Sequence, residues 1–186
     1  MSASGQVALL RGINVGGRAK VKMDALRAVF ASIGIDDAQT YLQSGNVVFA
    51  ADGDGRKLAA TIEAGIGEQL EIQVPVLVRS GAELAKAIDR NPFVKDVKDT
   101  ASLYITFLAA KPDPAGVKRI LAEAGPPDRI AVLGLEAHLD IPAGYGRTKL
   151  NNAQFERRLG VVATTRNWRT VTTLAEMAAQ IESRLS

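Results

Sequence analysis

The chain has 186 residues, of which 47% are hydrophobic and 23% are charged, a composition typical of globular proteins and not of disordered segments. It contains no cysteine and one histidine, which excludes disulfides, thiolate chemistry and a multi-histidine metal site within one chain. No run of about eighteen apolar residues occurs, so we expect no membrane partner and a cytoplasmic location. The formal net charge of +3 is too small to indicate nucleic-acid binding by itself, so the placement of the charges matters more than their sum.

The spacing of apolar residues predicts a first half in the order strand, helix, strand, strand, helix, strand. Met23, Leu26, Phe30 and Ile33 recur at helical spacing, and Gly34 ends that helix. Residues 43–46 separate two short β-rich runs and favour a tight hairpin turn. The predicted elements cover residues 7–10, 23–33, 38–42, 47–50, 58–70 and 74–78. This order is that of a ferredoxin-like unit.

The second half repeats the order. Asp113 is the expected N-cap of a helix with Pro114 at its first position, and Gly160 ends a shorter helix. The predicted elements cover residues 103–108, 114–124, 129–133, 136–141, 150–159 and 161–165. A capping box from Thr173 to Glu176 predicts the start of a last helix, which runs to Leu185.

Together the halves predict an α+β fold, with two ferredoxin-like βαββαβ halves, antiparallel sheets and a C-terminal helix. A capping box from Ser80 to Glu83 begins a further helix between the halves. We therefore expect a first ferredoxin-like subdomain over residues 1–79, a linker helix and loop over 80–100, and a second ferredoxin-like subdomain with the C-terminal helix over 101–186. We expect the three parts to pack as one compact unit.

A glycine-rich loop over residues 11–22 carries four cations and no acid, which favours an anionic ligand such as phosphate. It is no phosphate-binding P-loop, because Gly17 is followed by Arg18 and Ala19, and alanine cannot hold magnesium. In a ferredoxin-like sheet this loop lies beside the hairpin turn 43–46. We name the following residues the first basic cluster: Arg11, Asn14, Arg18, Lys20, Gln43, Ser44 and Asn46. The alternatives are a solvated surface loop, and amides that only satisfy the hairpin backbone.

The same topology brings the loop after the third strand of the second half beside the end of its fourth strand. We name the following residues the second basic cluster: Tyr145, Arg147, Lys149, Arg166, Asn167, Trp168 and Arg169. Aromatic rings among cations can stack on nucleic-acid bases for about 1–3 kcal/mol per base. The alternative for Trp168, the only tryptophan, is a core anchor that tethers the last helix.

His138 alternates with Glu136 and Asp140 on the polar face of a predicted strand. A proton shuttle or metal site on that face is conceivable, but an amphipathic strand explains the pattern, so we expect an ordinary exposed or half-buried histidine. We predict no metal site and no cofactor, and we assign no catalytic residue, because neither a nucleophile elbow nor a catalytic cysteine occurs.

The order and length of four motifs resemble the domain of unknown function 1697 family over nearly the whole chain. The motifs are Leu10-Arg11-Gly12-Ile13-Asn14-Val15-Gly16-Gly17, Tyr41-Leu42-Gln43-Ser44-Gly45-Asn46-Val47-Val48-Phe49, Gly146-Arg147-Thr148-Lys149-Leu150 and Thr165-Arg166-Asn167-Trp168-Arg169-Thr170-Val171. The resemblance implies a bacterial-type protein with two ferredoxin-like halves and implies no activity, because the family is uncharacterised. Thr148 replaces an expected serine, and Lys22 stands where proline is usual, so a different entry to the first helix is expected.

Three functions follow as hypotheses. The first is a binding module for a phosphate-bearing ligand, a nucleotide or nucleic acid, through the two basic clusters, with affinity that falls as salt rises. The second is an enzyme acting on a small anionic metabolite, and the third is a structural or protein-interaction role. The charge distribution favours the first; whether the protein is an enzyme and what its oligomeric state is are both left open.

Overall fold

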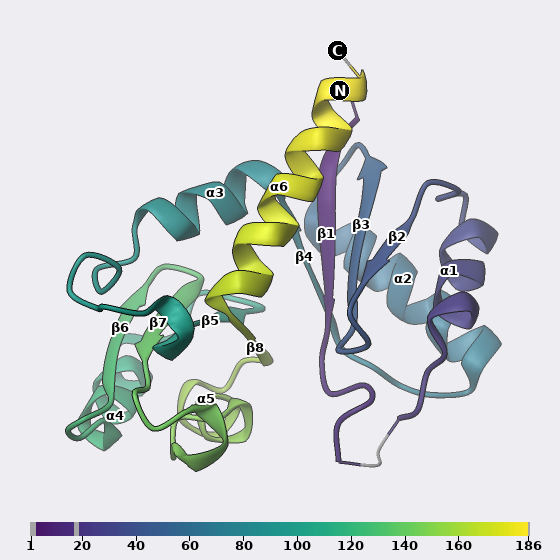
Figure 1. The fold of residues 1–186 in the computed structure, drawn as a ribbon. Helices are drawn as coiled ribbons and strands as arrows, with labels where there is room; N and C mark the ends of the chain where they lie inside the picture. Colours follow the sequence, from purple (N-terminus) through teal and green to yellow (C-terminus); the bar gives the residue numbers. More distant parts are fainter. Residues whose placement is uncertain (1–2, 17–18, 186) are drawn as a thin grey trace. The chain divides into compact units, whose positions relative to one another are not determined.

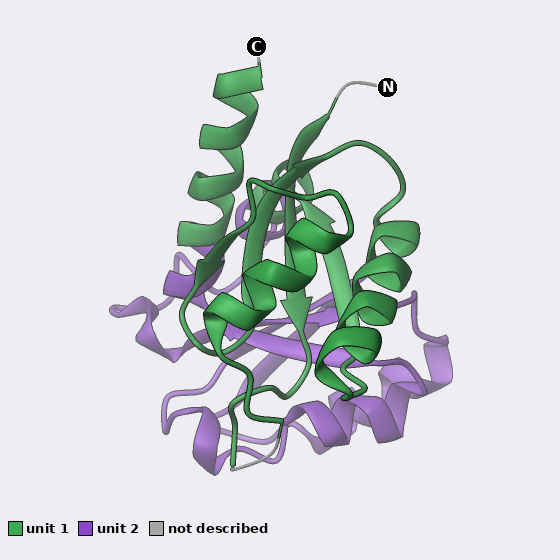
Figure 2. Ribbon diagram, turned by 90° about the vertical axis from the view of Figure 1, so that its right-hand side faces the viewer, with its two compact units in different colours: residues 1–85, 173–186 green, residues 86–172 purple. Residues whose placement is uncertain are grey.

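The structure, a computed structural model, describes residues 3–16 and 19–185 (Figure 1). The chain divides into two compact units, one formed by residues 1–85 with 173–186 and the other by residues 86–172 (Figure 2). Each unit holds one four-stranded antiparallel sheet with helices. The predicted α+β fold with two ferredoxin-like halves and a C-terminal helix is confirmed.

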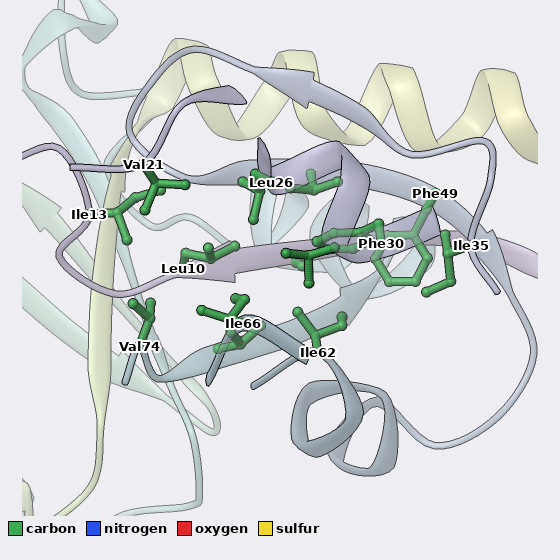
Figure 3. Close-up of a cluster of buried hydrophobic side chains, with 14 of the residues drawn as sticks. Leu10, Ile13, Val21, Leu26, Phe30, Ile35, Phe49, Ile62, Ile66 and Val74 are labelled. Carbon is green, nitrogen blue, oxygen red and sulfur yellow. The ribbon is translucent and has the colours of Figure 1, made fainter. Parts of the chain in front are cut away.

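The sheet of the first unit has the order β2-β3-β1-β4, in which every neighbouring pair is antiparallel. The strands are β1 Ser4–Leu10, β2 Gln39–Tyr41, β3 Asn46–Ala51 and β4 Val76–Ser80. Two helices, α1 Met23–Ser32 and α2 Gly55–Leu70, cover one face (Figure 1). Phe30 of α1 meets Phe49 of β3 edge to face, with the ring centroids 5.4 Å apart. This face is the core of the first unit (Figure 3). The buried side chains of Ile13 and Val21, both from the loop between β1 and α1, join that core.

The strand β1 begins at Ser4, three residues before the predicted start. The extension includes Gly5, where the long last helix, α6 Trp168–Leu185, crosses the strand (Figure 1). A Cβ atom at Gly5 would lie 2.2 Å from the main-chain oxygen of Ala178, so only glycine fits this crossing. Close packing therefore places glycine in a strand, a position that propensity alone disfavours.

The sheet of the second unit has the equivalent order β6-β7-β5-β8, again antiparallel throughout. The strands are β5 Leu103–Leu108, β6 Arg129–Leu133, β7 Glu136–Asp140 and β8 Ala163–Asn167. The helices α4 Pro114–Glu123 and α5 Asn152–Leu159 cover the face formed by Ala137, Leu139 and their neighbours. As predicted, the Asp113 side chain caps α4, by accepting a hydrogen bond from the main-chain N–H of Gly116.

Helices also follow the last strand of each half. The helix α3 Gly81–Asp89 follows β4, and the predicted capping box forms, because Ser80 and Glu83 bond each other's main-chain N–H groups. The helix α6 follows β8, but it begins at Trp168 and not at the predicted capping box of Thr173 and Glu176. Asn167 explains the earlier start, since its side chain accepts a hydrogen bond from the N–H of Thr170 at 2.8 Å. The prediction of that helix start was wrong.

Candidate functional site

The loop between β1 and α1 is held to the β2–β3 turn by the side chain of Asn14. Its amide nitrogen donates to the main-chain oxygens of Gln43 at 2.8 Å and Val21 at 2.9 Å. Its amide oxygen accepts from the N–H of Val21 at 2.8 Å. Asn14 has a φ of 54°, in the left-handed region that asparagine tolerates better than most residues. The expected neighbourhood of loop and turn is confirmed, and Asn14 fixes it.

A hollow of about 650 Å³ opens where this loop enters α1. Its lining side chains include two exposed lysines, Lys20 and Lys22, and the amide of Gln43. Lys22 is the N-cap of α1, and its side chain makes no capping hydrogen bond. The first N–H groups of α1 therefore have no side-chain cap, and the positive end of the helix dipole faces the same hollow. Lys22 therefore leaves the entry to α1 without a side-chain cap, as proline would, but adds a cation beside it.

The lining also contains one acid, Asp24, in the first turn of α1. Asp24 forms an ion pair with Arg27 one turn further on, and Arg27 donates to the hydroxyl of Thr40 at 2.7 Å. This pairing draws the carboxylate into a surface network on α1. The hollow thus combines two lysines, the amides of Asn14 and Gln43 and uncapped main-chain donors with one acid that is ion-paired on the surface of α1.

The remaining residues of the first basic cluster have other roles. Asn46 is completely buried, and its amide donates to the main-chain oxygen of Tyr41 and the hydroxyl of Ser44, which closes the turn. Arg11 is half-buried, and its main-chain N–H donates to Pro75 at 2.8 Å. Arg18 lies outside the described residues. The alternative reading of Asn46, as a residue that satisfies the hairpin backbone, is therefore the one that its contacts favour.

Tyr145, from the second basic cluster, points its hydroxyl into a polar network at the end of the second sheet. It donates to Thr165 at 3.0 Å and to Asn152 at 3.3 Å, and Thr165 also contacts the hydroxyl of Thr106 at 2.7 Å. The ring of Tyr145 packs on that of Tyr104, with centroids 5.2 Å apart. These contacts anchor the loop after β7, so the ring is not a free platform for a base.

Arg166 lies on the opposite face of β8, because side chains alternate along a strand and Thr165 faces Tyr145. It is only 8% exposed, and its guanidinium donates to the hydroxyl of Thr164 at 2.7 Å and the main-chain oxygen of Thr165 at 2.9 Å. Burial lowers the pKa of Arg166 to about 10, and Tyr145 opposes that shift to a smaller extent. The sheet thus separates Arg166 from the tyrosine that the sequence grouped with it.

The other members of the second basic cluster lie at the surface or at the start of α6. Asn167 caps α6, and Trp168, its first residue, is half-buried. Arg147, Lys149 and Arg169 are exposed. The hydroxyl of Thr148, which replaces the expected serine, donates to Asp128 at 2.6 Å and so holds this loop in place.

A second hollow, of about 580 Å³, lies beside Asp140 at the end of β7, and nothing in the sequence pointed to it. Arg129 donates to Asp140 at 2.9 Å and to Asp96 at 3.1 Å, and Asp140 also accepts from Ser102 at 2.6 Å. The bond to Asp140 is the main cause that raises the pKa of Arg129. Since acid and base satisfy each other here, the hollow offers a ligand little free charge.

His138 is completely buried, contrary to the expected exposed or half-buried histidine. It lies opposite Ile105 of β5 and Ala131 of β6, and neither ring nitrogen has a hydrogen-bond partner among the described residues. Desolvation, helped by the charge of Arg90, lowers its pKa to about 4. The ring is therefore neutral near pH 7 and acts as a packing group.

Sequence reasoning missed Lys22 and Met23, which line the first hollow. The signal for Lys22 was present, because it is one of the four cations of the loop. Among the described residues, no cluster of acids and histidine could hold a metal ion. Within that same part of the chain, every helix is too short or too polar to cross a membrane.

Comparison with known proteins identifies related folds and a family. A solved structure of a conserved bacterial protein, SP0830 from Streptococcus pneumoniae, shares the fold with a TM-score of 0.75 and 21% identity, over 96% of this chain and 99% of that chain. No curated protein matches the chain. The family model described as protein of unknown function (DUF1697) matches residues 4–137, which is more than half of the sequence. The chain therefore belongs to the DUF1697 family.

Proposed function

We propose that this protein binds a small phosphate-bearing ligand, of about mononucleotide size, in the hollow at the start of α1. One observation carries the proposal: Lys20, Lys22 and the uncapped first turn of α1 line a single hollow of about 650 Å³. That volume lies within the range of about 300–1,000 Å³ typical of small-molecule sites. Lysine ammonium groups and free helical N–H groups are the donors that phosphate oxygens prefer.

The rigid attachment of the loop supports this proposal. Asn14 joins the loop to the turn at Gln43, so two of the lining segments are fixed before a ligand arrives. A preformed site loses less conformational entropy on binding than a flexible one. This attachment favours a ligand site at the loop over the alternative of a solvated surface loop.

Enzymatic turnover of the ligand is the less supported alternative. The acid that lines the hollow, Asp24, is ion-paired with Arg27 on the surface of α1, and no lining residue has an assigned role in proton transfer. Our proposal is therefore binding without an assigned reaction. We further propose that the protein acts in the cytoplasm.

The direct test is calorimetric titration of the protein with nucleoside monophosphates and phosphorylated sugars, at low and at moderate salt. We expect saturable binding by one of these classes, weakened by salt, and loss of that binding in the variant Lys20→Ala/Lys22→Ala. The matched control is Lys111→Ala/Lys118→Ala, which removes the same charge from exposed positions outside the hollow and should bind like the parent. Equal loss in both double variants would show a diffuse charge effect and would refute the site.

The second basic cluster stays a prediction for nucleic acid, and a separate fluorescence titration with short oligonucleotides can test it. Trp168 is half-buried at the start of α6, beside exposed Arg169, so its fluorescence reports on ligands at that place. Quenching by short oligonucleotides that persists in Lys20→Ala/Lys22→Ala would move the proposal from the hollow to this cluster. A folded protein that responds to none of the probes would favour the structural role.

A further inference from the structure

The two sheets have four end strands. In two of them, β4 and β8, side chains of the same types hydrogen-bond the main-chain groups along the outer edge. In β4, Glu63 of α2 accepts from the main-chain N–H of Val76 at 2.7 Å, and Arg79 donates to the main-chain oxygen of Val78 at 2.9 Å. Both groups belong to the first and third residues of the strand, which present their free main-chain groups to the same side.

The strand β8 repeats this arrangement residue for residue. Glu156 of α5 accepts from the N–H of Ala163 at 3.2 Å, and Arg166 donates to the oxygen of Thr165 at 2.9 Å. Ala163 and Thr165, whose main-chain groups are bonded, are again the first and third residues of the strand, and the arginine is again the fourth. An exposed strand edge is a template for pairing with another chain, so these side chains prevent such pairing at both strands.

The other two end strands differ from each other. β2 has only three residues, and a very short strand is a poor template. β6 has five residues, Arg129–Leu133, and lies at the end of the second sheet (Figure 1). Within the described part of the chain, the main chain of residues 130–133 makes no hydrogen bond to any group outside the sheet. Among the described residues, β6 is therefore the one end strand of five residues whose outer edge has no side chain bonded to its main chain.

The turn after β6 determines which of its residues face outward. Gly134 and Leu135 form a two-residue connection to β7, so Leu133 and Glu136 are the hydrogen-bonded pair that closes the hairpin. Pairs alternate along an antiparallel ladder, so Ile130 and Val132 direct their N–H and C=O groups away from β7. Their side chains pack against the core of the second unit.

We propose that β6 pairs antiparallel with the β6 strand of a second copy of this chain, about a two-fold axis at Ala131. This register places Ile130 opposite Val132 of the second copy as a hydrogen-bonded pair, which uses the outward groups of both. The strand is self-complementary in this register, because β-branched residues oppose each other and the small Ala131 opposes itself.

Charge also favours a second copy as the occupant. Arg129 is the charged residue of β6, and the register places it opposite Leu133 and not opposite another arginine. Its guanidinium is already neutralised by Asp140 and Asp96, so no unpaired charge is buried by the pairing. The two sheets would then join into one continuous sheet across the axis.

The absence of cysteine in the chain makes the register directly testable. In the variant Ala131→Cys, the two thiols belong to a non-hydrogen-bonded pair, whose Cα atoms lie about 4.5 Å apart, within reach of a disulfide. The matched control Leu133→Cys places its two thiols about 14 Å apart along the strands, beyond that reach. Mild oxidation should give a covalent dimer of Ala131→Cys at low protein concentration and none of Leu133→Cys.

A second variant tests the main-chain hydrogen bonds. Val132→Pro removes an N–H that faces away from β7, whereas Val132→Thr keeps that N–H and the branched shape. Sedimentation velocity should show concentration-dependent dimers for the parent and Val132→Thr, and monomers for Val132→Pro. A parent that is monomeric at every concentration, equal cross-linking of both cysteine variants, or dimers that survive Val132→Pro in a folded protein would each overturn the proposal.

Discussion

Asn14 donates a hydrogen bond to the main-chain oxygen of Gln43 at 2.8 Å, and this bond joins two segments 29 residues apart. The same side chain bonds Val21 in both directions, so one amide organises the loop and the entry to α1. The geometry of the hollow therefore depends on a residue whose own polar groups are already used.

Replacing Asn14 by alanine should lower the free energy of unfolding by about 2 kcal/mol, because several main-chain groups lose their partner. Asn14→Asp is the informative comparison, since the carboxylate can still accept from Val21 but cannot donate to Gln43. We expect Asn14→Asp to be destabilised as well, by a smaller amount. Urea unfolding followed by circular dichroism measures both, and a stability equal to the parent in both variants would contradict the assigned role.

Leu42 has a φ of 57° and is 54% exposed, an unfavourable combination for a leucine. Asparagine tolerates this backbone conformation better, so Leu42→Asn should raise the free energy of unfolding by about 0.5–1 kcal/mol. Leu185→Asn, at an exposed residue of α6, is the control and should bring no gain. Thermal unfolding of the parent and the two variants measures the change in stability. A destabilised Leu42→Asn would show that the leucine side chain makes stabilising contacts.

His138 should make stability depend on pH. Its pKa is lowered from 6.5 to about 4, so between these values the unfolded chain binds a proton that the folded chain does not. Stability is therefore fully present above pH 6.5 and falls as the pH drops toward 4, by about 3 kcal/mol in total.

The variant His138→Leu isolates this effect from the titration of carboxylates. The ring makes no hydrogen bond among the described residues, so leucine should be tolerated at pH 7. We expect the stability of parent and variant to diverge steadily below pH 6.5, with the variant the more stable. Parallel curves from pH 7 to pH 4 would show that protonation of His138 does not oppose folding.

Gly5→Ala should be among the most damaging single substitutions. The added Cβ would lie 2.2 Å from the main-chain oxygen of Ala178, and a main-chain atom of a long helix cannot move aside cheaply. We expect a loss of about 3 kcal/mol or more in the free energy of unfolding. Gly125→Ala, where no atom lies within 4 Å of the added Cβ, should change stability little by the same measurement.

Local patterns were sufficient to predict most of the fold. Alternating and helical spacings, the turn at residues 43–46 and the Asp113 and Ser80 caps are local signals, and the structure contains all of them. The start of α6 was wrong because two capping signals compete within a few residues. Asn167 is the residue that caps α6, because β8 ends there and its side chain accepts a hydrogen bond from the N–H of Thr170.

The candidate site was less predictable, because it depends on contacts between distant segments. Asn14 and Asn46 carry amides, which often bind ligands. Here the amides instead donate to main-chain oxygens that only the folded loops bring near. Arg166 and Tyr145 are close in the predicted topology, but strand alternation sends them to opposite faces of the sheet. Residue type and neighbourhood could be read from the sequence, whereas the direction of each side chain could not.

The path of the chain through α6 bears on the order of folding. Residues 173–186 group with residues 1–85, so the first compact unit takes its last helix from the far end of the sequence. Ala178 of that helix meets Gly5, near the beginning of the chain. During synthesis on a ribosome, all residues of the second unit are therefore made before the first unit is complete. The first unit begins to emerge first, but it is completed last.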